Sequence, residues 1–257
     1  MGILDNFKLD GQVAVVVGAG KGIGRAIALG FAEAGADVAV AARTAGDLES
    51  LVAEIQAMGR KAIAVPTDAT NVDALENLAK ATVDQLGKVT IWVSNAGGIP
   101  DGQPRYLTRT SEAEWDAQIN LNLKGVWMGA VVATKYMGED GGVIINTSSR
   151  AAMGGQPKNG PYGAAKAGVN SLTSTLAMEL APKIRVNAVA PGPVPTENFD
   201  DCMGTETEEQ RQQLLKMMQI PLQRYGTEED IAAAAIYMAS PASSWVTGQC
   251  LYVTGGR

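Results

Sequence analysis

Short runs of apolar, largely β-branched residues alternate along this chain with longer segments of helical period, and this alternation constrains the fold more than any other feature. Seven runs are expected as strands, at Val13–Val17, Val38–Ala41, Ala62–Pro66, Ile91–Ser94, Val143–Thr147, Arg185–Val189 and Cys250–Val253. Six helices are expected between them, at Ile23–Ala34, Ala45–Met58, Val72–Leu86, Ser111–Met137, Pro161–Leu180 and Thr227–Ala239. Because runs such as Val13–Val17 are apolar throughout, both of their faces are expected to be buried. The sequence therefore predicts an α/β fold, a doubly wound, Rossmann-type parallel sheet of seven strands with helices on both faces.

The length of 257 residues suits one α/β domain, so we expect a single domain over residues 1–257. One connection departs from the alternation, because about 35 residues separate the strand that ends near Pro191 from the helix after Gly226. Connections of this length commonly form active-site lids. We therefore expect a substrate lid within residues 193–226, mobile without ligand, with a short apolar helix around Leu214–Met218. The alternative is a helix packed permanently on the body of the domain.

Composition excludes several classes of protein. Acidic residues outnumber basic ones by 27 to 21, so nucleic-acid and anionic-membrane partners are not expected. The chain contains no histidine, which excludes Ser–His–Asp and Cys–His catalysis and histidine metal sites. Cys202 and Cys250 form no CxxC pair, so neither a thiolate metal site nor a disulfide framework is expected. With no export signal in the first residues, these features predict a cytoplasmic protein whose acid–base chemistry uses Tyr, Lys, Cys, Asp or Glu.

A glycine-rich turn follows the first expected strand and opens into a helix. It reads Gly18-Ala-Gly20-Lys21-Gly22-Ile23-Gly24. Glycines permit a tight turn and close approach of the backbone to a diphosphate, and the free N–H groups and dipole of the helix attract the anion. In this strand–turn–helix context the motif predicts a dinucleotide site, the alternative being a turn that only serves helix packing.

The end of the second expected strand indicates which dinucleotide binds. NAD-binding sheets place a carboxylate there, about 20 residues beyond the glycines, where it binds the ribose hydroxyls. Here the strand ends in Ala42-Arg43, Asp37 lies at its other end, and Asp47 is expected in the following helix. The Arg43 guanidinium can hold a 2′-phosphate in a fork, and Lys21 can reach the same group. NADP(H) is therefore the expected cofactor, unless both cations are only solvated surface charges.

Three polar residues predict a catalytic site. Tyr162 and Lys166 are four positions apart in a segment of helical period, so they share one helix face. An ammonium beside a phenol favours the phenolate and lowers the pKa of the tyrosine from about 10, which provides an acid–base group without histidine. Such a pair alone is more often structural. Ser149, however, ends the fifth expected strand, at the sheet edge where ligand crevices form.

Together these motifs resemble those of the classical short-chain dehydrogenase/reductase family over essentially the whole chain. The resemblance rests on five motifs in order, namely Gly18-xxx-Gly22-Ile-Gly24, Asn95-Ala96-Gly97, Asn122 in Asn-Leu-Lys-Gly, Ser149 with Tyr162-xxx-Lys166, and Pro191-Gly192-Pro193-Val194-Pro195-Thr196. Two positions depart from the family pattern. Val17 stands where the family usually has threonine and Ser94 where it often has asparagine, but neither position touches the catalytic atoms.

The resemblance implies a role for each catalytic residue. Tyr162 exchanges a proton with the substrate oxygen, and Ser149 hydrogen-bonds that oxygen. Lys166 lowers the pKa of the tyrosine and holds the nicotinamide ribose. Asn122 supports a water-linked proton relay behind the lysine.

The resemblance also implies the cofactor contacts. Asp68 contacts adenine, Asn95 borders the adenosine ribose, and Thr196 with the backbone of Val194 holds the carboxamide. Further implied neighbours of the cofactor, besides the glycine turn and the Tyr–Lys pair, are Ala69, Ala96, Gly97, Pro191 and Gly192. Asp68 and Asn95 could instead be turn residues that satisfy local backbone groups.

These residues predict an NADP(H)-dependent oxidoreductase that interconverts a ketone and a secondary alcohol. The chain looks most similar to hydroxysteroid dehydrogenases and related ketone reductases of the family, which predicts a bulky apolar substrate. Members of this architecture are often homotetramers, so a homo-oligomer is expected. A remote alternative is a non-catalytic cofactor-binding protein, which the intact Ser–Tyr–Lys set disfavours.

The main alternative is a 3-oxoacyl-[acyl-carrier-protein] reductase, which must dock an acidic partner. Such reductases typically end the helix before the fifth strand in a Lys/Arg-rich run, where this chain has Glu139 and Asp140. Four cations could still form a local basic rim at the pocket, namely Arg105, Arg109, Arg150 and Lys158.

Overall fold

The computed structural model describes residues 2–100 and 103–256, and its seven strands form one parallel sheet. The strands are β1 (Val13–Val17), β2 (Asp37–Ala42), β3 (Ala62–Pro66), β4 (Ile91–Ser94), β5 (Gly142–Thr147), β6 (Ile184–Pro191) and β7 (Cys250–Val253). Their order is β3-β2-β1-β4-β5-β6-β7. The order reverses between β1 and β4, which opens a crevice at the carboxyl edge of the sheet. The predicted fold class is confirmed.

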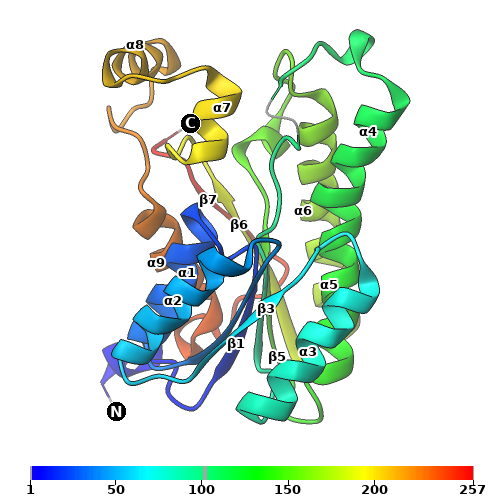
Figure 1. Cartoon of the computed structure of the whole chain (residues 1–257), viewed down its shortest axis with the longest axis vertical. Helices are drawn as coiled ribbons and strands as arrows, with labels where there is room; N and C mark the ends of the chain where they lie inside the picture. Colours follow the sequence, from blue (N-terminus) through cyan, green and yellow to red (C-terminus); the bar gives the residue numbers. More distant parts are fainter. Residues whose placement is uncertain (1, 101–102, 257) are drawn as a thin grey trace.

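Helices cover both faces of the sheet (Figure 1). One face is covered by α1 (Gly22–Glu33), α2 (Ala45–Ala57) and α9 (Glu228–Ala239), and the other by α3 (Val72–Leu86), α5 (Gly125–Tyr136) and α6 (Gly160–Leu180). The side chains of β1 alternate between two cores, with Val16 among α1, α2 and α9 and Val15 on the opposite face. This double burial explains why β1 is apolar at every position.

The helix predicted over Ser111–Met137 is wrong as a single element. The structure divides it into α4 (Glu112–Ile119), a π-helical turn (Asn120–Lys124) and α5. Inside the wide turn, the Asn122 side chain is fully buried and its Nδ2 donates to the backbone carbonyl of Gln118, 3.1 Å away. The side chain thereby takes a carbonyl that would accept a backbone hydrogen bond in a regular helix. A pattern of apolar residues does not indicate such a turn.

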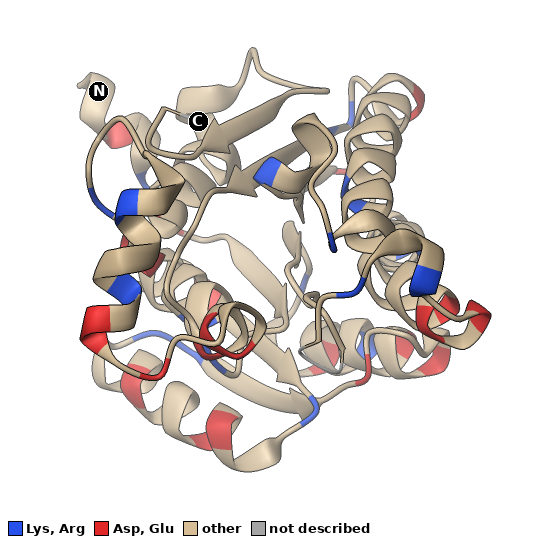
Figure 2. Cartoon of the chain, turned by 90° about the horizontal axis from the view of Figure 1, so that it is seen from above, with Lys and Arg blue, Asp and Glu red and all other residues tan. Residues whose placement is uncertain are grey.

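The long connection between β6 and α9 forms two helices, α7 (Glu197–Met203) and α8 (Glu208–Met218). The apolar helix expected around Leu214–Met218 is the second half of α8, whereas α7 was not predicted. The two helices are joined by two hydrogen bonds from Arg211 to Asp200, of 3.1 and 2.6 Å. They lie beyond the carboxyl edge of the sheet, above β6 and β7 in Figure 1. Seen from above, acidic and basic residues are interspersed over the surrounding helices (Figure 2).

Candidate active site

The predicted catalytic residues meet at the carboxyl edge of the sheet. Ser149 follows β5 closely and accepts a hydrogen bond from the backbone N–H of Ala151, 3.1 Å away, in a short 3-10 turn. Tyr162 lies in the first turn of α6 and Lys166 one turn later, so both side chains leave the same helix face. The Ser149 hydroxyl lies close enough to Tyr162 to lower the pKa of its phenol. The structure thus brings all three residues together.

Lys166 is buried, with 2% of its surface exposed. Its Nζ donates to the backbone carbonyl of Thr147, at the end of β5, over 2.7 Å. Burial lowers the pKa of Lys166 from 10.5 to about 8, because the ammonium loses its hydration. A buried lysine with a lowered pKa at the ligand edge of a sheet is typical of a functional residue.

Lys166 is not among the groups that set the pKa of Tyr162 here, so the expectation that it lowers this pKa stays a prediction. Burial raises the pKa of Tyr162, the Ser149 hydroxyl opposes that rise, and the nearby Cys202 thiol adds to it. The Lys166 ammonium lies 5.7 Å from the centre of the phenol ring and is bonded to the Thr147 carbonyl. Tyr162 therefore keeps its proton at neutral pH, as a general acid must.

Asn122 fastens the loop after β4 to the π-helical turn. Its Nδ2 donates to the carbonyl of Gly98 over 2.8 Å, and its Oδ1 accepts from the N–H of Gly98 over 2.9 Å. A Cβ atom at Gly97 would lie 2.8 Å from Asn122 Oδ1 and 3.2 Å from Lys166 Nζ. Asn122 and Lys166 therefore approach the same glycine, which leaves room only for a residue without a side chain.

The glycine turn has the shape of an anion cradle. Gly18 and Gly22 have φ of 85° and 59°, a region that favours glycine. A Cβ atom at Gly24 would lie 2.0 Å from the carbonyl oxygen of Gly18, so any side chain there would displace the turn. The helix α1 begins at Gly22 with no acidic residue in its first turn. Its free N–H groups and positive dipole end fit a diphosphate, as the sequence predicted.

The two cations expected at a 2′-phosphate have acidic neighbours. Lys21 Nζ forms an ion pair of 2.9 Å with Glu197, the first residue of α7. Asp47 lies in the first turn of α2, as expected. Its carboxylate is also close to the glycine turn, since a Cβ atom at Gly20 would lie 3.7 Å from its Oδ2. Arg43 follows β2 and helps to lower the pKa of Asp68, which is lowered mainly by hydrogen bonds from Thr70. Arg43 and Asp68 therefore lie near each other.

Two other predicted cofactor residues, Asn95 and Thr196, lie against the glycine turn. Asn95 Nδ2 donates to the Gly18 carbonyl over 3.0 Å and braces the glycine turn. Thr196 caps α7 by accepting from the N–H of Phe199, and its Cγ2 would lie 3.2 Å from a Cβ atom at Gly22. The start of the connection between β6 and α9 therefore contacts the glycine turn. Of the remaining predicted residues, Ala96 contacts Gly18 and Gly192 contacts Thr254. Ala69 and Val194 are buried, Pro191 is the last residue of β6, and Ile23 is the second residue of α1.

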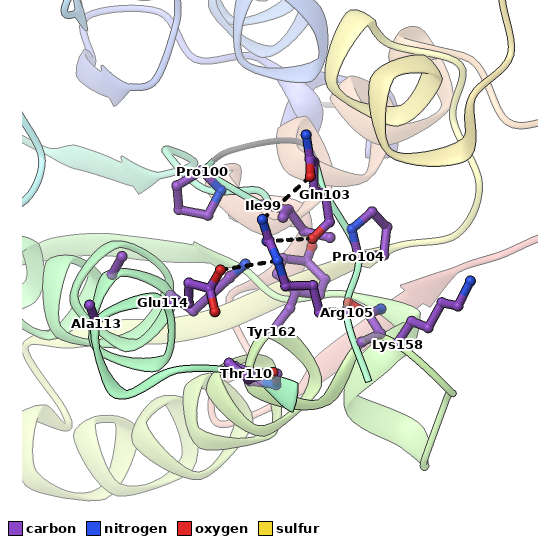
Figure 3. Close-up of a pocket in the computed structure, with 14 residues that line it drawn as sticks. Ile99, Pro100, Gln103, Pro104, Arg105, Thr110, Ala113, Glu114, Lys158 and Tyr162 are labelled. Carbon is purple, nitrogen blue, oxygen red and sulfur yellow. Dashed lines mark hydrogen bonds and ion pairs between the residues drawn. The ribbon is translucent and has the colours of Figure 1, made fainter. Parts of the chain in front are cut away.

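A pocket of about 280 Å³ opens beside Tyr162 (Figure 3). Its walls are largely apolar and are formed by Ile99, Pro100, Pro104, Ala113, Ala117 and Pro161. One polar cluster interrupts them, in which Arg105 forms an ion pair of 3.0 Å with Glu114 and donates to the Gln103 carbonyl over 2.9 Å. An apolar pocket with few polar groups beside a proton donor suits a small organic substrate.

Sequence analysis missed three residues of the site. Cys202 and Glu197 lie on α7, and Cys202 is close enough to Tyr162 to raise its pKa. Gln118 contributes its Oε1 to Asn122, 3.0 Å away. A short helix inside a long connection has too little hydrophobic periodicity to be predicted. The positions of Cys202 and Glu197 therefore could not be inferred from the sequence.

A protonated tyrosine and a buried lysine facing a dinucleotide cradle define an oxidoreductase that acts on CH–OH and C=O groups. Comparison with known proteins agrees. Residues 18–257 match the family model described as enoyl-(acyl carrier protein) reductase. The 3-oxoacyl-[acyl-carrier-protein] reductase of Thermotoga maritima is 37% identical over 251 residues, 97% of this chain and 98% of that protein. The chain belongs to the short-chain dehydrogenase/reductase family.

Two solved structures are similar throughout. A 7α-hydroxysteroid dehydrogenase, in complex with NADH and 7-oxo glycochenodeoxycholic acid, has a TM-score of 0.91 and 37% identity and covers 100% of this chain and 98% of its own. A gluconate 5-dehydrogenase from Burkholderia cenocepacia, in complex with NADP and tartrate, has a TM-score of 0.89 and 30% identity, over 99% and 98% of the two chains.

Proposed function

We propose that this protein is an NADP(H)-dependent oxidoreductase that interconverts a ketone and a secondary alcohol on a bulky, mainly apolar substrate such as a hydroxysteroid. The observation that carries the proposal is the convergence of three residues. Tyr162 lines the apolar pocket, Ser149 is near enough to influence its phenol, and the buried Lys166 ammonium lies 5.7 Å from the centre of its ring. The similar 7α-hydroxysteroid dehydrogenase supports the substrate class.

In the reductive direction, each residue has one task. The Ser149 hydroxyl, held by the Ala151 N–H, donates a hydrogen bond to the substrate carbonyl oxygen. Tyr162 gives its proton to that oxygen, and Lys166 stabilises the phenolate that remains. Bound nicotinamide supplies the hydride to the carbonyl carbon. The apolar walls exclude water from the reacting atoms. Oxidation of the alcohol runs the same transfers in reverse.

For the cofactor, Arg43→Ala should weaken NADPH binding by about ten- to a hundredfold and change NADH binding little. A charge-assisted contact to the 2′-phosphate is worth on the order of 1.5–3 kcal/mol. The measurement is the dissociation constant of each cofactor, with Arg60→Ala, which removes the same charge before β3 at the opposite edge, as the control. Equal affinities for NADPH and NADH in the unmodified protein would reject the assignment.

For the lid, we propose that residues 193–226 move without ligand and close over the substrate. The exposed positions of α8 support this proposal, since none of its residues is fully buried. Trypsin should cleave after Arg211 and Lys216 several-fold more slowly once NADP⁺ and an alcohol substrate are bound. Equal cleavage rates with and without ligands would make the segment a fixed part of the body.

The carrier-protein alternative has one observation in its favour. Lys158 lines the pocket, Arg109 lies over the same Tyr106 ring as Lys158, and neither cation has an acidic partner among the described residues. Against it, the turn after α5 has Glu139 and Asp140 in place of a Lys/Arg-rich run, and Glu139 forms an ion pair with Lys183. The two readings differ in kcat/KM. Acetoacetyl-carrier protein should be a poor substrate beside apolar ketones at matched concentration. A carrier-protein kcat/KM above that of every free ketone, falling steeply with salt, would favour the alternative.

We also propose a cytoplasmic homo-oligomer, a tetramer by family resemblance. Large exposed apolar side chains on neighbouring helices support an interface, with Trp127 and Val131 on α5 and Met178 on α6. Among residues 2–100 and 103–256, no helix has both the length and the apolar character needed to cross a membrane.

A further inference from the structure

The charges around the substrate pocket are unevenly compensated. The Arg105 guanidinium forms an ion pair of 3.0 Å with Glu114 and donates a hydrogen bond to the Gln103 carbonyl. Its positive charge is therefore compensated within the pocket wall. Lys158 lines the same pocket, at the opposite side from Glu114 in Figure 3. It forms no ion pair with any residue that the structure describes. The pocket therefore presents one uncompensated cation.

The surroundings of Lys158 add positive charge rather than remove it. Its Nζ lies 5.4 Å from the centre of the Tyr106 ring, and the Arg109 guanidinium lies 5.6 Å from the same ring. Arg109 also lacks an acidic partner among the described residues. Tyr106 is half-exposed, so both cations remain reachable from solvent. This rim is a place where an incoming anion meets two positive charges and an aromatic surface.

The backbone limits the distance between Lys158 and the reacting group. Lys158 precedes Tyr162 by four positions, so their Cα atoms are at most about 14 Å apart. The next residue, Asn159, forms a parallel β-bridge with Arg105, which ties the two sides of the pocket mouth together. Lys158 has φ of 66°, where glycine or asparagine would be less strained. A lysine is therefore held at this mouth in spite of its backbone conformation.

We propose that Lys158 binds an anionic group of the substrate at the mouth of the pocket. The substrate is then an apolar ketone or alcohol that carries a carboxylate at the end remote from the reacting carbon. This inference rests on the proposed function and specifies its substrate class. The apolar walls hold the body of the molecule, Tyr162 and Ser149 meet the carbonyl, and Lys158 meets the carboxylate, which is ionised at neutral pH.

Binding tests the proposal without requiring turnover. The protein loaded with NADPH, with which an alcohol cannot react, is titrated by calorimetry with deoxycholate and with its neutral methyl ester. The unmodified protein should bind the acid about three- to tenfold more tightly than the ester, an effect reduced by solvent at an exposed site. Lys158→Ala should abolish this preference, and Lys158→Glu should reverse it. Lys88→Ala, which removes a lysine before β4 at the opposite edge of the sheet, should leave it unchanged.

Kinetics with a keto steroid acid and its methyl ester complete the test. Because Lys158 lies away from the reacting atoms, Lys158→Ala should raise KM for the acid and leave kcat unchanged. Equal affinities for acid and ester in the unmodified protein, or a preference that survives in Lys158→Ala, would overturn the proposal. So would a 3-oxoacyl-CoA that binds tenfold more tightly than the acid and depends on Lys158, since its anion is a phosphate. Failure of the proposed function is distinguishable, because no ketone is then reduced while the acid–ester difference in binding persists.

Discussion

Tyr162→Phe is expected to lower turnover by about two to four decades, because it removes the hydroxyl that we propose protonates the substrate oxygen. The ring itself is kept, so folding and cofactor affinity should survive. The measurement is the steady-state rate of NADPH oxidation with a bulky ketone, alongside the dissociation constant of NADPH. Tyr136→Phe removes the same atom from α5, away from the pocket, and should retain full activity. Near-normal turnover in Tyr162→Phe would remove this tyrosine from the mechanism.

Lys166→Met is expected to lower turnover on the order of a hundredfold and also to weaken cofactor binding. In the proposed mechanism its ammonium stabilises the phenolate, and family resemblance implies that it also holds the nicotinamide ribose. The folded protein should tolerate the change. Methionine has a similar length, and the loss of a buried charge offsets the loss of the hydrogen bond to the Thr147 carbonyl.

The same variant has a pH signature in stability. The pKa of Lys166 is about 8 in the folded protein, whereas an ordinary lysine, as in the unfolded chain, has a pKa of 10.5. Between these values the unfolded chain holds a proton that the folded chain does not, so the unmodified protein gains stability as the pH rises. Each pH unit of that window adds about 1.4 kcal/mol. The free energy of unfolding of the unmodified protein should therefore rise by about 3 kcal/mol relative to Lys166→Met from pH 8 to 10.5. A constant difference in urea denaturation across this range would show that Lys166 is not desolvated.

The sheet could be predicted because strands that are buried on both faces are apolar at nearly every position. All five residues of β1 are apolar, since Val15 and Val16 enter different cores. The catalytic residues follow β5 and share one turn of α6, so their convergence needed only the topology of the sheet. These features depend on local pattern and on one general rule of parallel sheets.

Features that depend on single tertiary contacts could not be predicted. Lys21 and Glu197 are 176 positions apart, and no local pattern pairs them. The π-helical turn depends on where one buried amide, Asn122, finds its partners. The pKa of Tyr162 is raised mainly by burial, and the Lys166 ammonium is bonded to the Thr147 carbonyl. Spacing along a helix fixes the face that two residues share, but neither their burial nor their hydrogen bonds.

Isotope transfer tests the central claim most directly. The protein is incubated with NADPH that carries deuterium at the transferable position of the nicotinamide, together with a bulky apolar ketone, and the alcohol is analysed by mass spectrometry. The account predicts one deuterium on the carbinol carbon, a solvent-exchangeable proton on its oxygen, and loss of product in Tyr162→Phe. Failure of every such ketone to yield labelled alcohol, or equal yields from the unmodified protein and Tyr162→Phe, would contradict it.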